Sequence, residues 1–166
     1  MLTVRLADRV QPDTLRGLVA LQPPCEVTLT VTPRAHAGSG GGHDDGGRFA
    51  GLTLGADGPE RHGAWGLFVT PAGRVELATR GLLEWPSDEI GRVLPGPVTL
   101  QVQLGAEHFE VIANGVSLGT RPYGARPDAG WLGLFVRRAE ADFEGLTVTH
   151  RRDASGPRPW YGRGRP

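Results

Sequence analysis

The stretch Val98–Thr149, VTLQVQLGAEHFEVIANGVSLGTRPYGARPDAGWLGLFVRRAEADFEGLTVT, decides the fold. Its first seven residues alternate apolar and polar side chains, which is the pattern of a strand with one buried and one solvated face. A second strand, His108–Ala113, runs into Asn114-Gly115 and continues as Val116–Leu118. Asn-Gly supplies the two residues with positive φ that a type I′ hairpin requires. The stretch therefore predicts consecutive strands with no helix between them.

Segments with the same alternation lie on both sides of this hairpin. They are expected to form strands at Leu2–Leu6, Cys25–Thr32, Phe49–Leu54, Ala64–Thr70, Arg74–Thr79, Leu132–Val136 and Ala139–Thr149. The first strand is expected to lie beside the last. Two segments break the pattern: Pro12–Val19 can form a short helical turn capped by Asp13 or Thr14, and Arg80–Gly96 is a long connection without alternation.

Two four-residue segments are identical. Gly66–Val69 and Gly133–Val136 both read GLFV, and each follows closely behind a tryptophan. The repeat is too short to indicate a duplicated domain, so we expect two structurally equivalent strands.

In order and pattern, the chain resembles the concanavalin A-like lectin and glucanase superfamily, which includes the laminin-G-like jelly rolls. The matching segments are FEVIANG at Phe109–Gly115, GWLGLF at Gly130–Phe135 and ADFEGLTV at Ala141–Val148. The resemblance implies an all-β, antiparallel two-sheet jelly-roll sandwich over residues 1–149, followed by a basic tail at 150–166. This fold hosts lectins, glycosidases, lyases and structural modules, so it leaves the activity open.

The composition suits one soluble domain. With 26 Gly and 14 Pro among 166 residues, long helices are not expected. Eighteen basic residues balance 18 acidic ones, so no overall field favours nucleic acid or an anionic membrane as partner. Cys25 has no cysteine to pair with, which fits a reducing compartment. No signal peptide or transmembrane segment is recognised, and we expect a cytoplasmic protein or part of an assembly.

Outward-facing side chains and one loop tryptophan are candidates for ligand binding. Trp85 lies on the Arg80–Gly96 connection, where its ring can stack on a sugar while nearby carboxylates accept hydrogen bonds from hydroxyls. Alternatively, it plugs one open end of the sandwich. The outward surface is expected to join Arg74, Glu76, Gln101, Gln103, Glu110, Trp131 and Arg137. Trp131 best distinguishes a binding face from an ordinary solvated sheet, because an exposed tryptophan on a polar face is unusual without a partner.

Three alternate carboxylates, Glu140, Asp142 and Glu144, resemble the catalytic E-x-D-x-E of the family 16 glucanases that share this fold. The resemblance implies one nucleophile and one acid/base. However, Ala141 stands where those enzymes carry a larger aliphatic residue, and the motif lies in the closing strand rather than in mid-chain.

Burial parity also argues against catalysis at these positions. Phe143, Leu146 and Val148 can all be buried only if a bulge near Glu144-Gly145 shifts the register, and such a bulge would turn Glu144 away from its two predecessors. Non-catalytic relatives carry similar letters, so we expect no catalysis here. Asp142 or Glu144 could instead help to hold a structural calcium.

A glycine-rich loop, Pro33–Arg48, contains four residues able to bind metal: His36, His43, Asp44 and Asp45. Imidazole and carboxylate groups are competent ligands for a divalent ion. The alternative is a flexible connection with no metal, because no rigid element fixes these side chains.

The last sixteen residues, RRDASGPRPWYGRGRP, hold five Arg against one Asp. This composition indicates either a disordered tail or a docking arm. In the second case Trp160 and Tyr161 would anchor the arm, while Arg151 and Arg152 pair with an acidic surface on a neighbouring copy. Nucleic acid is a weaker candidate because the rest of the chain carries an acidic excess.

The sequence therefore predicts a binding module that acts without catalysis and without a cofactor, with carbohydrate as its ligand. One alternative is a structural or assembly protein, such as a virion or tail component, tethered by the C-terminal arm. Another is a glycoside hydrolase of the same fold, which would depend on Glu140, Asp142 and Glu144.

Overall fold

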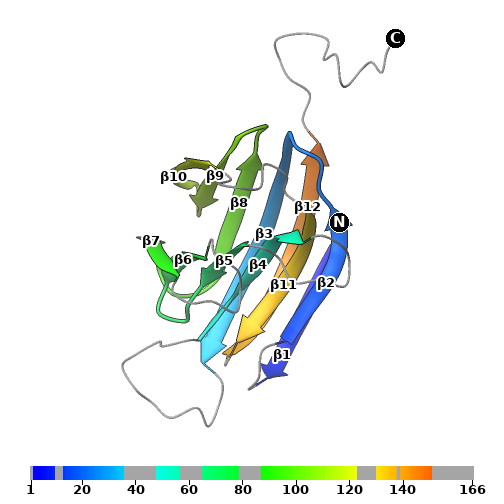
Figure 1. Ribbon diagram of the computed structural model, residues 1–166. Coiled ribbons are helices and arrows are strands. Elements are labelled where there is room, and N and C mark those ends of the chain that lie inside the picture. Colours follow the sequence, from blue (N-terminus) through cyan, green and yellow to red (C-terminus); the bar gives the residue numbers. More distant parts are fainter. Residues whose placement is uncertain are drawn as a thin grey trace, which may run out of the picture.

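Twelve β-strands make up the regular structure of the computed structural model, which describes residues 2–9, 13–35, 48–56, 65–78, 87–122, 130–137 and 139–150. Of residues 2–9, 13–18, 35 and 56 only the backbone is described. The strands form two antiparallel sheets that lie face to face (Figure 1). No helix that could cross a membrane occurs in these ranges.

Sheet A contains the first and the last strand. Its order is β1 (Leu2–Arg9), β12 (Ala139–His150), β3 (Cys25–Ala35), β8 (Val98–Leu104), β9 (His108–Ala113) and β10 (Val116–Pro122). The first strand pairs with the last, as the sequence predicts.

Sheet B is built from the intervening segments. Its order is β2 (Asp13–Ala20), β11 (Trp131–Arg137), β4 (Phe49–Ala56), β5 (Trp65–Val69), β6 (Arg74–Ala78) and β7 (Asp88–Arg92). Because the chain passes repeatedly from one sheet to the other, consecutive elements such as β3 and β4 lie in different layers.

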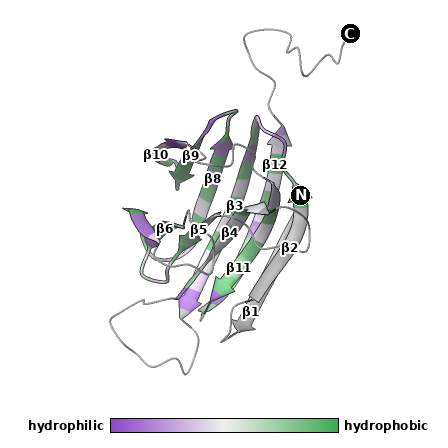
Figure 2. Ribbon diagram, in the orientation of Figure 1, coloured by the Kyte–Doolittle hydropathy of each residue, from purple (hydrophilic) through white to green (hydrophobic). Residues whose placement is uncertain are grey.

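The core lies between the two sheets and is made by the inward side chains of alternating strands. Val27, Leu29 and Val31 of β3 are fully buried, whereas Thr28 and Thr30 between them are not. Apolar and polar residues alternate visibly along β8 (Figure 2). Burial of this apolar surface stabilises the fold by about 25 cal/mol for each Å² and is the main force that holds the layers together.

The predicted hairpin at Asn114-Gly115 is confirmed. Both residues have positive φ, 48° and 81°, as a type I′ turn requires. The side-chain Oδ1 of Asn114 accepts a hydrogen bond of 2.8 Å from the Thr99 backbone N–H, and the Asn114 N–H donates to the Thr99 carbonyl. The turn is thus tied to β8 as well as to its own strands.

The predicted bulge in β12 is also confirmed. The register against β3 shifts between Glu144 and Thr147, Gly145 has a φ of 64°, and Phe143 and Leu146 are both buried. The shift comes after Glu144, which pairs with Thr30. The expectation that the bulge turns Glu144 away from Glu140 and Asp142 is therefore wrong.

The two GLFV segments are equivalent strands, as expected, and both border β4. Leu52 pairs with Leu67 on one side and with Leu134 on the other, and Gly51 pairs with Phe68 and Phe135 in the same way. The identical sequences therefore place identical side chains on both sides of one central strand.

Two segments without alternation are strands, contrary to the prediction. Asp13–Ala20 is β2 rather than a helical turn, because pairing with β11 overrides the local capping signal of Asp13 or Thr14. Asp88–Arg92, within the predicted connection, is β7 and pairs with β6. Its register is irregular, so a strict period of two could not reveal it.

Candidate functional site

The predicted outward surface is divided between two faces. Gln101, Gln103 and Glu110 belong to sheet A, whereas the other members of the set, Arg74, Glu76, Trp131 and Arg137, belong to sheet B. In a two-layer sandwich the outer faces of the layers point in opposite directions. The prediction of one shared surface is therefore wrong, and each face must be considered separately.

The outer face of sheet A is polar and largely bonded to itself. Thr30 and Thr99 share a hydrogen bond of 3.1 Å between their hydroxyls, and Gln103 Nε2 donates to Glu26 Oε2 at 3.2 Å. Ser117 Oγ donates to Glu110 Oε1 at 2.7 Å. Cross-strand pairs of this kind stabilise a solvated sheet, which is a sufficient reason for their presence.

The three carboxylates of β12 lie on this same polar face. Arg34 Nη1 lies 2.9 Å from Asp142 Oδ2, and Arg34 Nε lies 4.0 Å from Glu140 Oε2. The hydrogen bond with Asp142 raises the pKa of the Arg34 guanidinium above its ordinary value. Two of the three carboxylates therefore serve a cross-strand ion pair between β3 and β12.

Aromatic rings gather on the outer face of sheet B. Phe49, Phe68 and Phe135 form an aromatic cluster with centroid separations of 4.5, 5.7 and 5.8 Å, and Ala78 packs with them. Each ring is at most 5% exposed. The cluster is therefore a second, smaller hydrophobic core on the outer face of sheet B. Its rings are too deeply buried to stack on a ligand.

Glycine lets the rings approach each other. Phe68 and Phe135 lie on either side of Gly51, which has no side chain to separate them. The Arg137 guanidinium lies 6.0 Å from the centre of the Phe49 ring, at the limit of a cation–π contact.

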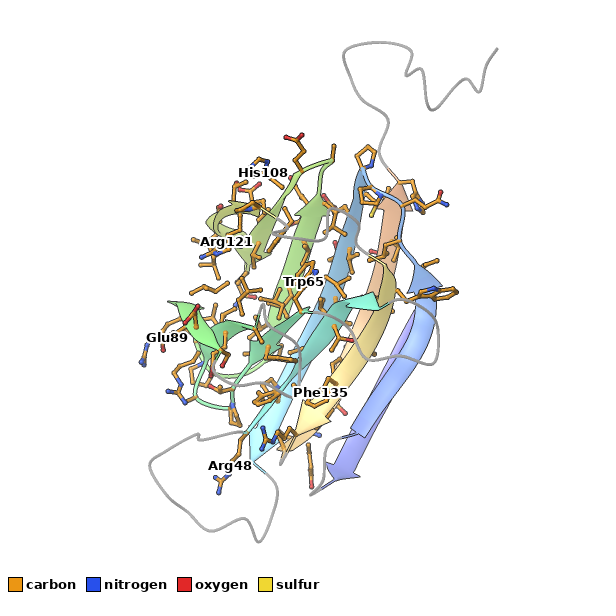
Figure 3. The ribbon with its side chains drawn as sticks, in the orientation of Figure 1. Arg48, Trp65, Glu89, His108, Arg121 and Phe135 are labelled. Atoms are coloured by element: carbon orange, nitrogen blue, oxygen red, sulfur yellow. The ribbon has the colours of Figure 1, made fainter. Side chains whose placement is uncertain are left out.

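Four charged side chains, Arg74, Glu76, Glu89 and Arg92, form a charged quartet beside the aromatic cluster. Arg74 pairs with Arg92 across β6 and β7, and Glu76 pairs with Glu89. Like charges are therefore opposite each other, while unlike charges follow each other along each strand. Figure 3 shows Glu89 on β7 at the free edge of sheet B, with Phe135 farther along the sheet on β11.

The quartet has few internal bonds. Arg92 Nη2 lies 3.0 Å from Glu89 Oε1, and Ser87 Oγ donates to Glu76 Oε1 at 2.5 Å. The Nε of Arg74 is buried and has no hydrogen-bond partner among the described residues. A buried donor without a partner is costly, because it loses its hydrogen bond to water.

The position of β7 is fixed from inside the sandwich. A Cβ on Gly91 would lie 2.7 Å from Leu118 Cδ2 of β10, so Gly91 faces inward and lets the edges of the two sheets meet. Ile90 also packs on the core. With two consecutive residues turned inward, Glu89 and Arg92 on either side of them are directed outward.

Of the two predicted tryptophans, one lies away from the quartet and the other lies outside the residues that the structure describes. Trp131 is half-buried at the start of β11, and β4 and β5 separate that strand from β6. Trp85 lies outside the described residues. The four histidine and aspartate positions of the 36–45 loop and the tail positions Arg151, Arg152, Trp160 and Tyr161 also lie outside them. In the described ranges no group of three or more potential metal ligands occurs.

Sequence reasoning missed Arg92 and considered Glu89 only as a carboxylate near Trp85, because it placed both in a connection. The run Asp88-Glu89-Ile90-Gly91-Arg92 does contain a signal, since two charged ends enclose an apolar residue and a glycine. It also missed the aromatic cluster, although the repeated GLFV puts one phenylalanine on each side of β4.

No protein-family model and no curated protein sequence matches the chain. Solved structures do match its fold. A double-substitution variant of human galectin-16 covers 89% of this chain and all of its own at 14% identity, with a TM-score of 0.58. A tetrameric galectin from the ball sponge Cinachyrella covers 84% of this chain and 99% of its own at 18% identity, with a TM-score of 0.56.

A third similar structure is the carbohydrate-binding module CBM66 from Bacillus subtilis. It covers 86% of this chain and 84% of its own at 12% identity, with a TM-score of 0.59. At identities this low the likeness concerns the fold alone. The chain therefore has the concanavalin A-like jelly-roll sandwich that the sequence predicts.

Proposed function

We propose that this protein binds carbohydrate through the outer face of sheet B, at the charged quartet on β6 and β7. The observation that carries the proposal is the arrangement of Arg74, Glu76, Glu89 and Arg92 on two adjacent strands. Like charges directly opposite each other destabilise a sheet, so this arrangement is poor for the stability of an empty face. It is well suited to a ligand that offers both donors and acceptors.

Sugar hydroxyls meet this requirement. A carboxylate accepts a hydrogen bond from a hydroxyl, and a guanidinium donates to a hydroxyl oxygen. Neighbouring strands lie about 4.8 Å apart, and alternate residues on a strand about 7 Å apart. The quartet thus spans roughly one sugar ring, with donors on one side and acceptors on the other.

The surroundings of the quartet also support a site here. The neighbouring aromatic cluster is packed and rigid, and it borders Glu76 through Phe68 on β5. Binding residues held on such a support need little ordering when the ligand arrives. Because β7 is an edge strand, the quartet is accessible at the side of the sandwich. One protein of similar fold is itself a carbohydrate-binding module.

The test is a glycan array read with the wild type and with variants on each face. We expect Glu76→Ala and Glu89→Ala to weaken binding about tenfold or more, since each removes a charged hydrogen-bond acceptor. Gln103→Ala, on the outer face of sheet A, is the matched control and should bind like the wild type. Thermal melting verifies that each variant is folded.

Two results would refute the proposal. One is a blank array with a folded wild-type protein. The other is binding that survives both glutamate substitutions but is lost in Gln103→Ala, which would move the site to sheet A.

A further inference from the structure

We infer that the sugar bound at the charged quartet carries an anionic group, a carboxylate or a sulfate, held between Arg74 and Arg92. This inference rests on the proposed function and specifies the class of sugar.

The two arginines of the quartet lie directly opposite each other. Arg74 and Arg92 are register partners on β6 and β7, and directly opposed side chains start from Cβ atoms about 5 Å apart. Two guanidinium groups in that position repel each other. An anion bound between them turns this repulsion into two attractive contacts, and guanidinium groups match the planar oxygens of such an anion.

Arg74 also has an unsatisfied hydrogen-bond donor. The Nε of Arg74 is buried and lacks a hydrogen-bond partner among the described residues. The Arg74 backbone N–H, by contrast, donates to Thr70 Oγ1 at 3.1 Å, so the strand itself is held in place. A ligand oxygen at Nε would replace the hydrogen bond that burial has removed.

The two carboxylates of the quartet are already engaged, unlike the Nε of Arg74. Both carboxylates already receive a hydrogen bond or an ion pair, from Ser87 on Glu76 and from Arg92 on Glu89. The contact between Arg92 and Glu89 is exposed, with 70% and 42% of the side chains accessible, and it uses one nitrogen of Arg92. Exposed pairs of this kind are weak, so a ligand can share or displace them. The hydrogen-bonding groups of the quartet that remain available to a ligand are thus mainly donors.

An amino sugar is the opposite possibility, because Glu76 and Glu89 also oppose each other. A ligand ammonium would have to compete with the groups that already contact these carboxylates. It would also leave the Arg74 Nε without an acceptor. We therefore favour the anion and include a cationic sugar in the test.

The experiment is titration calorimetry of the full chain with matched sugar pairs. The probes are oligosaccharides of galacturonan and hyaluronan, each beside its carboxyl-reduced form, and carrageenan oligosaccharides beside their desulfated form. Chitosan oligosaccharides are the cationic probe. We expect an acidic form to bind at least about tenfold more tightly than its neutral counterpart, and its affinity to fall as salt rises from about 0.05 to about 0.5 M.

Two variants separate a specific contact from a general charge effect. Arg74→Gln should abolish the preference, so that the acidic and neutral forms of a sugar bind with equal affinity, and it should weaken binding of the acidic form more than binding of the neutral form. Arg34→Gln removes the same charge from the outer face of sheet A, where Arg34 contacts Asp142, and should keep the full preference.

The outcomes separate the two proposals. Equal affinity for acidic and neutral forms, or tighter binding of chitosan, overturns the anion inference and leaves sugar binding intact. Equal loss of preference in Arg74→Gln and Arg34→Gln also overturns it, because net charge would then explain the selectivity. If a folded protein binds no sugar of either kind, the proposed function itself fails.

Discussion

Gly51 shows how one missing side chain organises the outer face of sheet B. It sits in the middle strand between Phe68 and Phe135, and a Cβ there would overlap the carbonyl oxygen of Leu67 and lie 2.8 Å from the Phe68 Cα. Both are backbone atoms of a paired strand and cannot move alone. The residue is therefore required for the spacing of β4 and β5 and for the contact between the rings.

Gly51→Ala should lower the free energy of unfolding by about 3 kcal/mol, the upper range for overpacking. Gly91→Ala is the comparison, because the nearest atoms to its Cβ belong to the Leu118 side chain, which can rotate, rather than to backbone. Its cost should be about 1 kcal/mol. Urea unfolding of both variants provides the measurement, and equal losses would contradict the assigned contacts.

Cys25 is a buried titratable group in the core. Burial raises the pKa of its thiol to about 11. Between the ordinary thiol pKa and about 11, the folded protein keeps a proton that the unfolded chain loses, so the free energy of unfolding falls as the pH rises. We expect the stability advantage of the wild type over Cys25→Ala to shrink between about pH 8 and about pH 10.5.

Chemical denaturation at the two pH values measures this difference. Thiol-reagent labelling gives an independent check, since the native protein should react far more slowly than the unfolded chain. A wild type and a variant that lose stability in parallel would show that Cys25 does not titrate as described.

At the scale of elements, the β9–β10 hairpin combines a local and a long-range requirement. Asn114 adopts positive φ and also accepts the hydrogen bond from the Thr99 N–H. Asn114→Ala loses both properties and should cost about 2 kcal/mol. Asn114→Asp keeps the acceptor and tolerates the conformation, so its cost should stay below about 1 kcal/mol. Denaturant midpoints of the two variants decide the matter, and a smaller loss in alanine than in aspartate would be inconsistent with the turn.

The carboxylates of β12 should be dispensable for binding. Asp142→Asn removes an ion pair whose Arg34 partner is 44% exposed, so the stability should change by less than about 1 kcal/mol. Glycan binding should not change, because β12 and the quartet lie in different sheets. Loss of binding in this variant, measured on the same array, would point to the outer face of sheet A.

Element by element, the sequence predicted those strands whose side chains alternate strictly, such as β3 and β8. It missed β2 and β7, because their side chains do not alternate strictly and their conformation depends on pairing with β11 and β6. The sequence analysis also could not distinguish the orientations of the two tryptophans near GLFV. Trp65 stands one residue before its glycine and stacks on Phe109 in the core at 4.5 Å, whereas Trp131 stands two residues before and has the opposite parity.

At the scale of the whole molecule, the two outer faces differ in kind. Sheet A presents polar side chains that bond to each other, with Arg34 tied to Asp142 and Gln103 to Glu26. Sheet B presents a packed aromatic cluster next to charges whose arrangement is unfavourable without a ligand. Alternation along single strands could predict which side chains point outward but not which sheet each strand joins. That assignment depends on pairing between segments far apart in the chain.

The central claim is that sugar binds on the outer face of sheet B. Its most direct test is amide chemical-shift mapping by NMR with the oligosaccharide that binds most tightly in calorimetry. We expect shifts concentrated at residues 74–78 of β6 and 88–92 of β7, with the amides of β3, β8 and β12 unchanged. Shifts concentrated on those three strands of sheet A would contradict it.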